Sequence, residues 1–416
     1  MKRILWLSNV RFSSNSIKGT GTWLQPLAKA LTQHYAIFHI CCGTENAIKE
    51  ELIDGIKQYV LPNRKCISNT QIPDKETCKD VASIIKKITP DMIHVWGTEA
   101  KWAYMKVLGV YGSYKTLLDI QGLLQSCYEA YYGGLTTYEK FRCLGKKEIL
   151  LPSRSIYYCR TIFKKKAIVE GKILGSYDNI SYQSDWVRNR LLALNLKARL
   201  YSTKIIIRSE FFQNKWKPTK NSSPIVFTSS ASATSYKGLH VLLKTCSLLK
   251  KKYPHFRLYI AGRLMIKSHG VLSGYESYLL SLVKKYKIEE NIIFLGPLSI
   301  DQMISYQLQS DMCVVPSFVE SYCLGLAESL ALGLPSIAAY SAAMPTIAAD
   351  KEEVIFYNPM DYADCAAKII ELFESKQKSL DMSLKSIKRR LEENEENIVV
   401  ETQKNIYESI IGKSCS

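Results

Sequence analysis

Three features are missing from this sequence of 416 residues: long apolar runs, cysteine pairs of the Cys-x-x-Cys type, and an Asp-x-Asp motif. Every apolar stretch is interrupted well before the roughly 18 residues that a transmembrane helix needs. The N-terminus begins basic and then turns apolar, but Arg11 ends that run too early for a signal peptide. We therefore predict a buried first strand and a cytoplasmic protein.

The cysteines are numerous but scattered. There are 12, and only Cys41 and Cys42 are close together in the sequence. This spacing indicates neither a zinc site nor a disulfide framework. We interpret them as free thiols in a reducing compartment.

Positive charge dominates the composition, with a formal net charge of +18. Such an excess implies a polyanionic partner: nucleic acid, an anionic membrane surface or a phosphorylated substrate. Between Lys140 and Lys172 the chain carries ten Lys or Arg and only two Glu, interleaved with aromatic residues. One interpretation is that this 140–172 segment docks against the inner face of the cytoplasmic membrane. The other is a pair of solvated basic helices.

The chain is too long for one ordinary core, which favours two domains. Short apolar runs alternate with amphipathic segments in both halves, and this β-α-β alternation implies two doubly wound parallel sheets facing a central cleft. Residues 209–224 have no clear period and are rich in turn formers, as expected of a linker. We therefore predict domains at 1–208 and 225–390, with a charged helix and tail at 391–416 that returns to the first domain.

Two glutamates follow the predicted strand Met312–Val315. Glu320 lies in the loop after that strand, and Glu328 lies eight residues later in the next predicted helix. Ligands bind beyond the carboxyl ends of the strands in open parallel sheets. The free N–H groups of a first helical turn can also receive a phosphate oxygen. The pair can therefore hold a sugar and a ribose on either side of a diphosphate. Taken alone, the same spacing also fits an ordinary acidic helix start.

The surrounding residues resemble the family 4 glycosyltransferases, which are retaining enzymes with the two-domain GT-B fold. The resemblance is strong over 225–375 and looser in the N-terminal half, where it rests on Pro90 to Thr98 and a glycine-containing loop. The motifs that carry it are the E-x7-E signature from Pro316-Ser317 through Glu328 to Gly333-Leu334-Pro335, the run Asn291 to Gly296, and Lys237-Gly238-Leu239 followed by Ala261-Gly262.

This resemblance implies a role for each matching residue. Glu320 would bind the hydroxyls of the donor sugar, and Glu328 would hold the nucleotide ribose. Lys237 would bind the diphosphate and stabilise charge on the leaving group. The remaining donor-site positions are Tyr322, Cys323, Leu324, Gly325, Gly296 and Pro297.

One position departs from the family pattern. The family commonly has an arginine five residues before the lysine, where this chain has Ser232. Arg263, which directly follows Ala261-Gly262, is the candidate substitute; the alternative is a structural surface arginine. GT-B enzymes are generally independent of metal ions, so the missing Asp-x-Asp pair agrees with the resemblance, and we predict no cofactor and no metal.

The N-terminal domain would supply the acceptor side. Gly19, Thr20 and Gly21 lie between the first strand and the next helix, where glycine lets the backbone approach a phosphate; a plain turn explains them equally well. Similar enzymes often have a histidine where this chain has Gln121. Gln121 would then be a hydrogen-bonding group near the reacting centre, and Asp119 could also point into the cleft.

The sequence therefore predicts a retaining hexosyltransferase that takes a UDP- or GDP-type sugar to a glycan or a lipid-linked acceptor of a cell-surface polysaccharide such as a capsule. A GT-B epimerase or sugar phosphorylase is the alternative. No nucleic-acid motif accompanies the positive charge, so we expect no nucleic-acid partner.

Overall fold

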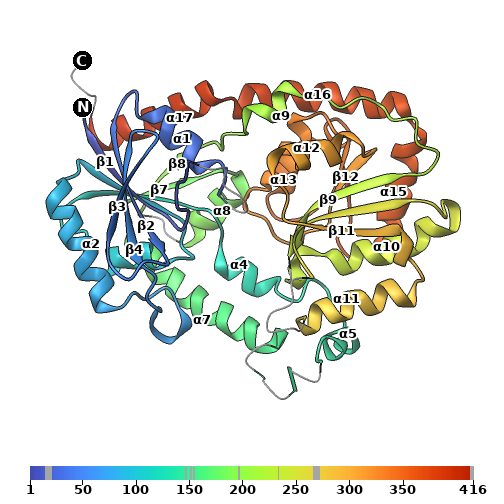
Figure 1. The fold of residues 1–416 in the computed structure, drawn as a ribbon, viewed down its shortest axis with the longest axis horizontal. Helices are drawn as coiled ribbons and strands as arrows, with labels where there is room; N and C mark the ends of the chain where they lie inside the picture. Colours follow the sequence, from blue (N-terminus) through green and yellow to red (C-terminus); the bar gives the residue numbers. More distant parts are fainter. Residues whose placement is uncertain are drawn as a thin grey trace. The chain divides into compact units, whose positions relative to one another are not determined.

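The computed structural model describes residues 1–14, 21–145, 148–149, 152, 155–194, 197–232, 234–265 and 272–412. The chain divides into two compact units (Figure 1). The N-terminal unit comprises Met1–Tyr128, Ile162–Ile206 and Glu393–Ser416, and the C-terminal unit comprises Glu129–Thr161 and Ile207–Glu392. The chain thus crosses between units near the predicted linker, but also at two places that the domain prediction did not include.

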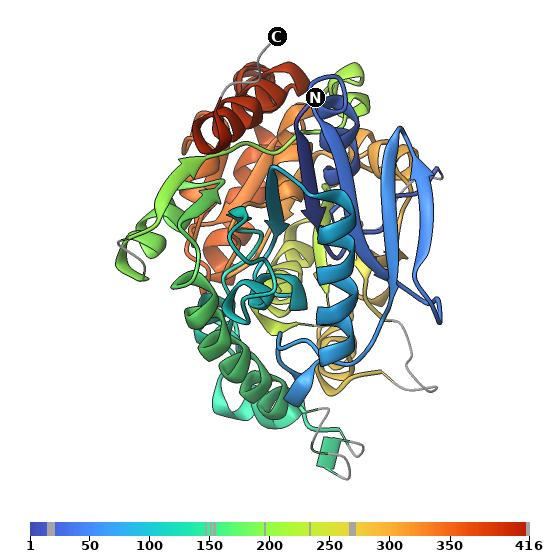
Figure 2. The same cartoon turned by 90° about the vertical axis from the view of Figure 1, so that its left-hand side faces the viewer.

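The sheet of the N-terminal unit has eight strands in the order β3-β4-β2-β1-β5-β6-β7-β8. All neighbours are parallel except β3 and β4, which form an antiparallel hairpin at one edge. Helix α2 lies across one face of this sheet (Figure 2). The strands are β1 (Arg3–Leu7), β2 (Ala36–Gly43), β3 (Lys49–Ile53), β4 (Ile56–Pro62), β5 (Met92–Trp96), β6 (Lys115–Asp119), β7 (Asn179–Tyr182) and β8 (Arg199–Ser202). The helices are α1 (Leu24–Leu31), α2 (Lys75–Ile88), α3 (Lys101–Val107), α8 (Asp185–Leu194) and α17 (Glu396–Ile411), with α4 (Leu124–Glu129) and α7 (Ile156–Leu174) crossing between the units.

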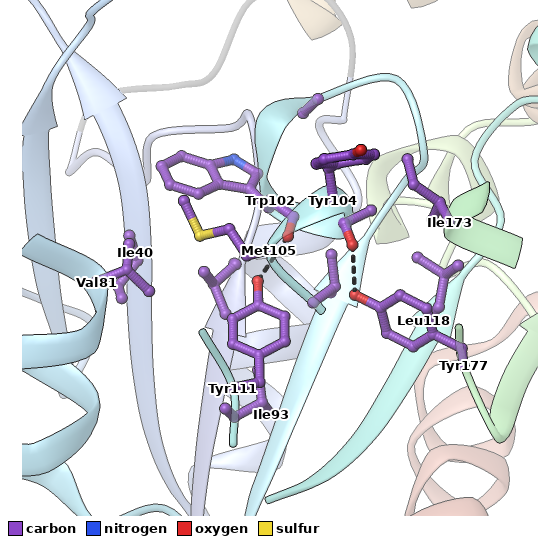
Figure 3. Close-up of a cluster of buried hydrophobic side chains, with 14 of the residues drawn as sticks. Ile40, Val81, Ile93, Trp102, Tyr104, Met105, Tyr111, Leu118, Ile173 and Tyr177 are labelled. Atoms are coloured by element: carbon purple, nitrogen blue, oxygen red, sulfur yellow. Dashed lines mark hydrogen bonds between the residues drawn. The ribbon is translucent and has the colours of Figure 1, made fainter. Parts of the chain in front are cut away.

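The core of the N-terminal unit packs helix α3 between the sheet and the end of α7. Trp102 and Tyr111 are fully buried, and the Tyr111 hydroxyl donates to the Trp102 carbonyl at 2.7 Å (Figure 3). The Tyr177 hydroxyl donates to the Ala103 carbonyl at 3.1 Å. Both tyrosines therefore bury their rings and still satisfy their hydroxyls on the backbone of one short helix.

Helix α17 returns from the end of the chain to pack in the N-terminal unit beside α1. Its buried Tyr407 receives a hydrogen bond from Trp6 Nε1 at 2.9 Å, and its hydroxyl lies 2.7 Å from His94 Nδ1. The ring of Tyr407 also meets the edge of Tyr35, which follows α1. The last helix is thus bonded to side chains of two central strands rather than lying loose on the surface.

The C-terminal unit has six strands, all paired in parallel, in the order β11-β10-β9-β12-β13-β14. Successive strands run outward from β9 to β11, and the chain then returns to place β12 on the other side of β9. The strands are β9 (Ile225–Ser232), β10 (Arg257–Arg263), β11 (Ile292–Gly296), β12 (Met312–Val315), β13 (Ser336–Ala339) and β14 (Val354–Tyr357). The helices are α5 (Thr137–Arg142), α9 (Ser209–Gln213), α10 (Leu239–Lys252), α11 (Gly274–Lys285), α12 (Ile300–Leu308), α13 (Leu324–Ala331), α14 (Met344–Ile347), α15 (Tyr362–Glu374) and α16 (Lys376–Asn394).

The segment Glu129–Thr161 comes from the first half of the sequence but packs on the C-terminal unit. Ser235 Oγ donates to the Tyr131 carbonyl, and His240 Nε2 lies 2.9 Å from the Gly133 carbonyl oxygen. Gly133 has a φ of 55°, and a Cβ there would stand 2.3 Å from the Ser235 carbonyl oxygen. Glycine is therefore required for this close backbone contact.

The predicted fold class is confirmed, since both units are parallel-sheet α/β structures. Strand β12 has the predicted bounds, Met312–Val315. The β3–β4 hairpin and the edge strands β8 and β14 were not predicted, and a short helix, α9, begins the segment that we predicted as a linker. Among the described residues, no helix is both long enough and apolar enough to span a membrane.

Candidate active site

The candidate site lies where the strand order of the C-terminal unit reverses. β9 and β12 are direct neighbours, although two strands separate them in sequence. Lys237 ends the 3-10 turn Ser235–Lys237 that follows β9, and Glu320 lies in the loop that follows β12. Such a reversal leaves a crevice at the carboxyl edge of the sheet, which is the usual ligand site of doubly wound folds.

Close backbone contacts join the two loops. Gly238, which follows Lys237, has a φ of 74°, and a Cβ there would stand 1.9 Å from the Pro316 carbonyl oxygen. The Phe318 N–H donates to the Tyr236 carbonyl at 2.8 Å. The Lys-Gly pair of the sequence motif is therefore explained by packing: only glycine allows the lysine turn to lie against the Pro-Ser loop.

Lys237 and Glu320 form an ion pair. Lys237 Nζ donates to Glu320 Oε1 at 2.6 Å, and their side chains are 24% and 13% exposed. Burial disfavours the charged ammonium, but the negative charge of Glu320 outweighs it, so the pKa of Lys237 lies above its ordinary value. The site thus holds a fully charged cation beside a carboxylate at the reversal point.

Glu328 is paired with an arginine that the sequence analysis did not identify. Its side chain is 8% exposed on helix α13, and its Oε1 accepts from Arg208 Nη2 at 2.7 Å and from Arg208 Nε at 3.2 Å. Burial raises the pKa of Glu328, and the charge of Arg208 opposes that shift. Arg208 lies just before α9, 120 residues earlier in the chain, and no local motif indicates its role.

Three hydroxyls near the reversal point are buried without a hydrogen-bond partner among the described residues: Thr228 Oγ1, Ser229 Oγ and Ser317 Oγ. Thr228 and Ser229 lie in β9, and Ser317 lies in the loop after β12. A Cβ on Gly325, in the first turn of α13, would stand 2.3 Å from Ser229 Oγ. Buried hydroxyls normally find a partner, and Ser229 Oγ lies beside the first turn of α13, so an oxygen of an anionic ligand fits at that position.

The register of the sheet places Arg263 beside Ser232. These two residues are Cα partners on the parallel strands β10 and β9. Paired residues on adjacent strands project to the same side of the sheet. Arg263 is exposed, while Ser232 and Thr234 bond to each other through their hydroxyls. Arg263, the predicted substitute for the missing arginine, is therefore the direct neighbour of Ser232 on the adjacent strand.

The other donor-site positions divide into two groups. Cys323 is buried and caps α13, whose first residues are Leu324 and Gly325, and burial raises the pKa of the Cys323 thiol. The Tyr322 hydroxyl receives a 3.4 Å hydrogen bond from Arg390 of helix α16. By contrast, Gly296 ends β11 and Pro297 follows it, and β10 separates that strand from β9. The place of these two residues in the donor site stays a prediction.

In the N-terminal unit, Asp119 ends β6 and is fully buried. It accepts hydrogen bonds from Ser181 Oγ at 2.7 Å, from Gln183 Nε2 at 2.8 Å, and from the amide of Gln121. Burial raises the pKa of Asp119 to about 7, against these three donors. Asp119 therefore holds Gln121 in place, and Gln121 is the half-buried member of the pair.

Two further carboxyl groups lie near Asp119, and sequence reasoning missed both. Burial raises the pKa of Glu99 to about 7, and its Oε2 has no partner among the described residues. Glu170 accepts from Thr98 Oγ1 and from the N–H groups of Leu124 and Gln125, and burial raises its pKa as well. The N-terminal unit thus has three carboxyl groups, from segments far apart in sequence, whose pKa burial raises.

The glycine loop after β1 is only partly described. Gly19 and Thr20 lie outside the described residues. Gly21 has a φ of 75°, and its carbonyl accepts from the Leu24 N–H at the start of α1 at 3.1 Å. A Cβ on Gly21 would stand 2.3 Å from the Val10 side chain, so the turn requires glycine here.

Comparison with known proteins agrees with this geometry. Residues 210–389 match the family model described as "Glycosyl transferases group 1". Among curated proteins, Staphylococcus aureus CapJ is 26% identical over 179 residues, which is 42% of each chain. The chain spans less than half of the length of this relative, and a 37% identical glycosyltransferase of Haemophilus influenzae matches over 26% of its own length.

Solved structures match over nearly the whole chain. Sucrose-phosphate synthase of Thermosynechococcus elongatus has a TM-score of 0.75 at 15% identity, covering 100% of both chains. HepE of Anabaena, solved in complex with UDP-glucose, has a TM-score of 0.68 at 14% identity, covering 98% of this chain and 99% of that one. Identities this low establish the fold alone. Together these findings show that residues 210–389 are similar to the group 1 glycosyl transferases and that the chain has the GT-B fold.

Proposed function

We propose that the protein is a retaining hexosyltransferase that works without a metal ion. It takes a hexose from a UDP- or GDP-type sugar and transfers it to a glycan or lipid-linked acceptor in the assembly of a cell-surface polysaccharide. The likeness to CapJ supports the polysaccharide context, and the UDP-glucose bound to HepE supports the donor class.

The donor would occupy the crevice between β9 and β12. Glu320 accepts hydrogen bonds from the sugar hydroxyls, and Lys237 moves from Glu320 to the diphosphate as the donor enters. The orphaned hydroxyls of Ser229 and Ser317 donate to the phosphate oxygens. Both Arg208 bonds end on Oε1 of Glu328, which leaves Oε2 for the ribose hydroxyls.

The reaction would proceed on one face of the sugar. The bond from C1 to the diphosphate oxygen breaks as the bond from C1 to the acceptor oxygen forms, and the leaving phosphate oxygen takes the acceptor proton. The products are a glycoside of unchanged anomeric configuration and a free nucleoside diphosphate. Lys237 stabilises the negative charge that develops on the leaving group, because a fixed cation aimed at developing charge lowers the barrier.

The observation that carries this proposal is the Lys237–Glu320 pair at the strand reversal, next to the buried unpartnered hydroxyls. A thermal-shift screen tests it directly. UDP or GDP, and the corresponding sugars, should raise the melting temperature without added metal and in the presence of EDTA. If UDP, GDP and ADP and their sugars all leave the melting temperature unchanged, the donor-site assignment is wrong.

Product analysis then tests the reaction. With donor and acceptor, NMR of the product should show the anomeric configuration of the donor retained. With the nucleotide sugar alone, a transferase leaves the sugar stereochemistry intact. Interconversion of the free donor would instead identify an epimerase, and phosphorolysis of a glycan with inorganic phosphate would identify a phosphorylase.

A further inference from the structure

The segment Glu129–Thr161, which packs on the C-terminal unit, exposes aromatic side chains to solvent. Tyr138 and Phe141 on α5 are 67% and 65% exposed, and Tyr157 and Tyr158 at the start of α7 are 40% and 36% exposed. We call these four residues the aromatic surface. Exposed large apolar side chains are ordinary when scattered singly, but four within 21 residues indicate an interaction site.

Tyr132 joins the two helices into one surface. Its ring lies 5.9 Å from the ring of Tyr157, measured between centroids. Lys140 Nζ of α5 stands 4.9 Å from the centroid of the Tyr132 ring, and Arg160 Cζ of α7 stands 5.2 Å from it. Tyr132 therefore links α5 to α7, because a cation from each helix lies against its ring.

Two acidic side chains of the same segment, Glu139 and Glu148, bond to the body of the C-terminal unit. Glu139 accepts from Lys244 Nζ at 2.5 Å and from the Tyr278 hydroxyl at 2.8 Å, both within the body of the C-terminal unit. Glu148 accepts from the Gly274 N–H at 2.7 Å, at the start of α11. These carboxylates fasten the segment to the unit, while Phe141 and the exposed Arg142 remain at the surface.

We propose that the aromatic surface, together with Lys140, Arg142 and Arg160, docks the protein on a bilayer leaflet rich in anionic lipid. Tyrosine and phenylalanine suit the boundary between headgroups and acyl chains. Each nearby cation adds about 1 kcal/mol of attraction to an anionic leaflet. The proposed docking surface comprises α5 and the first turns of α7, a smaller region than the basic segment 140–172. Phe163 is left out because it is half-buried, whereas Tyr138, which lies outside that segment, is included because it is exposed.

Charge distinguishes this occupant from a second copy of the chain. The protein carries a formal net charge of +18, so two copies meeting through a basic surface would repel each other. An anionic leaflet attracts the same surface and offers an apolar layer for the four rings. The docking surface does not depend on the transferase reaction, although it would bring a lipid-linked acceptor within reach of the donor-binding unit.

Vesicle co-sedimentation at low salt tests the proposal. The full-length protein should sediment with vesicles of phosphatidylcholine and phosphatidylglycerol and stay in solution with phosphatidylcholine alone. The double variant Lys140→Gln and Arg142→Gln should bind the anionic vesicles about thirtyfold more weakly, since it loses two cations. Tyr138→Ser with Phe141→Ser should also lose binding, without any change in charge.

The matched control is Leu384→Ser on α16, which removes an apolar side chain of equal exposure, 68%, from the same unit. It should bind vesicles like the unaltered protein. All variants should keep the melting temperature and the nucleotide response of the parent, so a failure of docking is distinct from a failure of the donor site. Unchanged vesicle binding by both double variants overturns the proposal. So does concentration-dependent dimerisation in sedimentation velocity that the Tyr138 and Phe141 changes abolish.

Discussion

The carboxyl groups predicted for the site have different partners in the two units. In the C-terminal unit, Glu320 and Glu328 each bond to a cation, Lys237 and Arg208. In the N-terminal unit, Asp119 accepts hydrogen bonds from neutral groups, namely a serine hydroxyl and two glutamine amides. Burial is similar, since Glu328 and Asp119 are both buried. The charge of the partner is therefore the difference between the two kinds of site.

The charge of the partner distinguishes a carboxyl group that can bind a ligand from one that has a structural role. A cation beside a buried carboxylate favours its ionised form and leaves lone pairs to accept from a sugar or ribose hydroxyl. A carboxyl group held by neutral donors, with a pKa near 7, is already satisfied and serves to fix its neighbours. We infer that the C-terminal unit carries the donor chemistry and that Asp119 organises the loop of Gln121.

The largest effect is expected from Lys237→Ala. Loss of a cation aimed at the leaving group should lower kcat by about a hundredfold to a thousandfold, with a smaller change in donor KM. Glu320→Ala should also abolish transfer in a folded protein. Steady-state kinetics with the intact donor measure both changes. Lys251→Ala, on the exposed face of α10, is the matched control and should keep full activity. Retained turnover in Lys237→Ala would remove the lysine from the reaction.

Arg208→Ala tests whether the positive charge of Arg208 keeps Glu328 ionised and able to bind the donor. Without Arg208, nothing opposes the effect of burial on Glu328, so its pKa should rise further. The ionised carboxylate accepts stronger hydrogen bonds from hydroxyls than the protonated form, so donor affinity should fall about tenfold to a hundredfold. As the pH is lowered, Glu328 of the variant should become protonated at a higher pH than Glu328 of the parent. Donor affinity should therefore be lost at that higher pH.

Calorimetric titration with the nucleoside diphosphate across pH measures this effect, and Arg208→Lys should restore part of it. The double variant with Glu328→Gln completes a mutant cycle. If the two single changes add without coupling, Arg208 acts on the nucleotide independently of Glu328.

Arg263→Ala should have a smaller effect on the same site. A charge-assisted hydrogen bond contributes about 1.5–3 kcal/mol. Because Arg263 is exposed, its effect should lie at the lower end, a loss of donor affinity of about tenfold. Because Arg263 and Ser232 are register partners, Ser232→Arg in the Arg263→Ala background should restore affinity. Arg257→Ala, at the opposite end of β10, is the control and should leave donor affinity unchanged. Equal affinity in the parent and Arg263→Ala would make Arg263 a plain surface residue.

The sequence predicted what depends on local pattern. Strand and helix periodicity located most elements, because alternating burial leaves a signature in neighbouring residues. The positions of Glu320, Glu328 and Lys237 at strand ends followed from the order of elements. Gly238 was part of the motif, and the structure adds the reason: its Cα lies against the Pro316 carbonyl.

What the sequence did not predict depends on distant contacts. Arg208 and Glu328 are 120 residues apart, and neither flanking sequence indicates the other. The segment Glu129–Thr161 lies in sequence between two parts of the N-terminal unit, so only its contacts with Ser235 and His240 reveal that it packs on the C-terminal unit. The β3–β4 hairpin was missed because β3 is short and half-exposed, with charged residues that resemble a loop.

The smallest expected effect is on stability and comes from Asp119→Asn. The folded pKa of Asp119, about 7, lies above the ordinary value of an aspartate, so its stabilising contribution is fully present below the ordinary pKa and is lost as the pH rises through about 7. An asparagine stays neutral and lacks that dependence. The melting temperature of the variant should therefore fall less than that of the parent between pH 5 and pH 8, by a few degrees, because about 1 kcal/mol corresponds to about 2–4 °C for a unit of this size. Asp178→Asn, an exposed control in the same unit, should follow the parent. Parallel curves for parent and Asp119→Asn would show that this carboxyl is ionised throughout, and the contrast between the two units would then rest on hydrogen bonding alone.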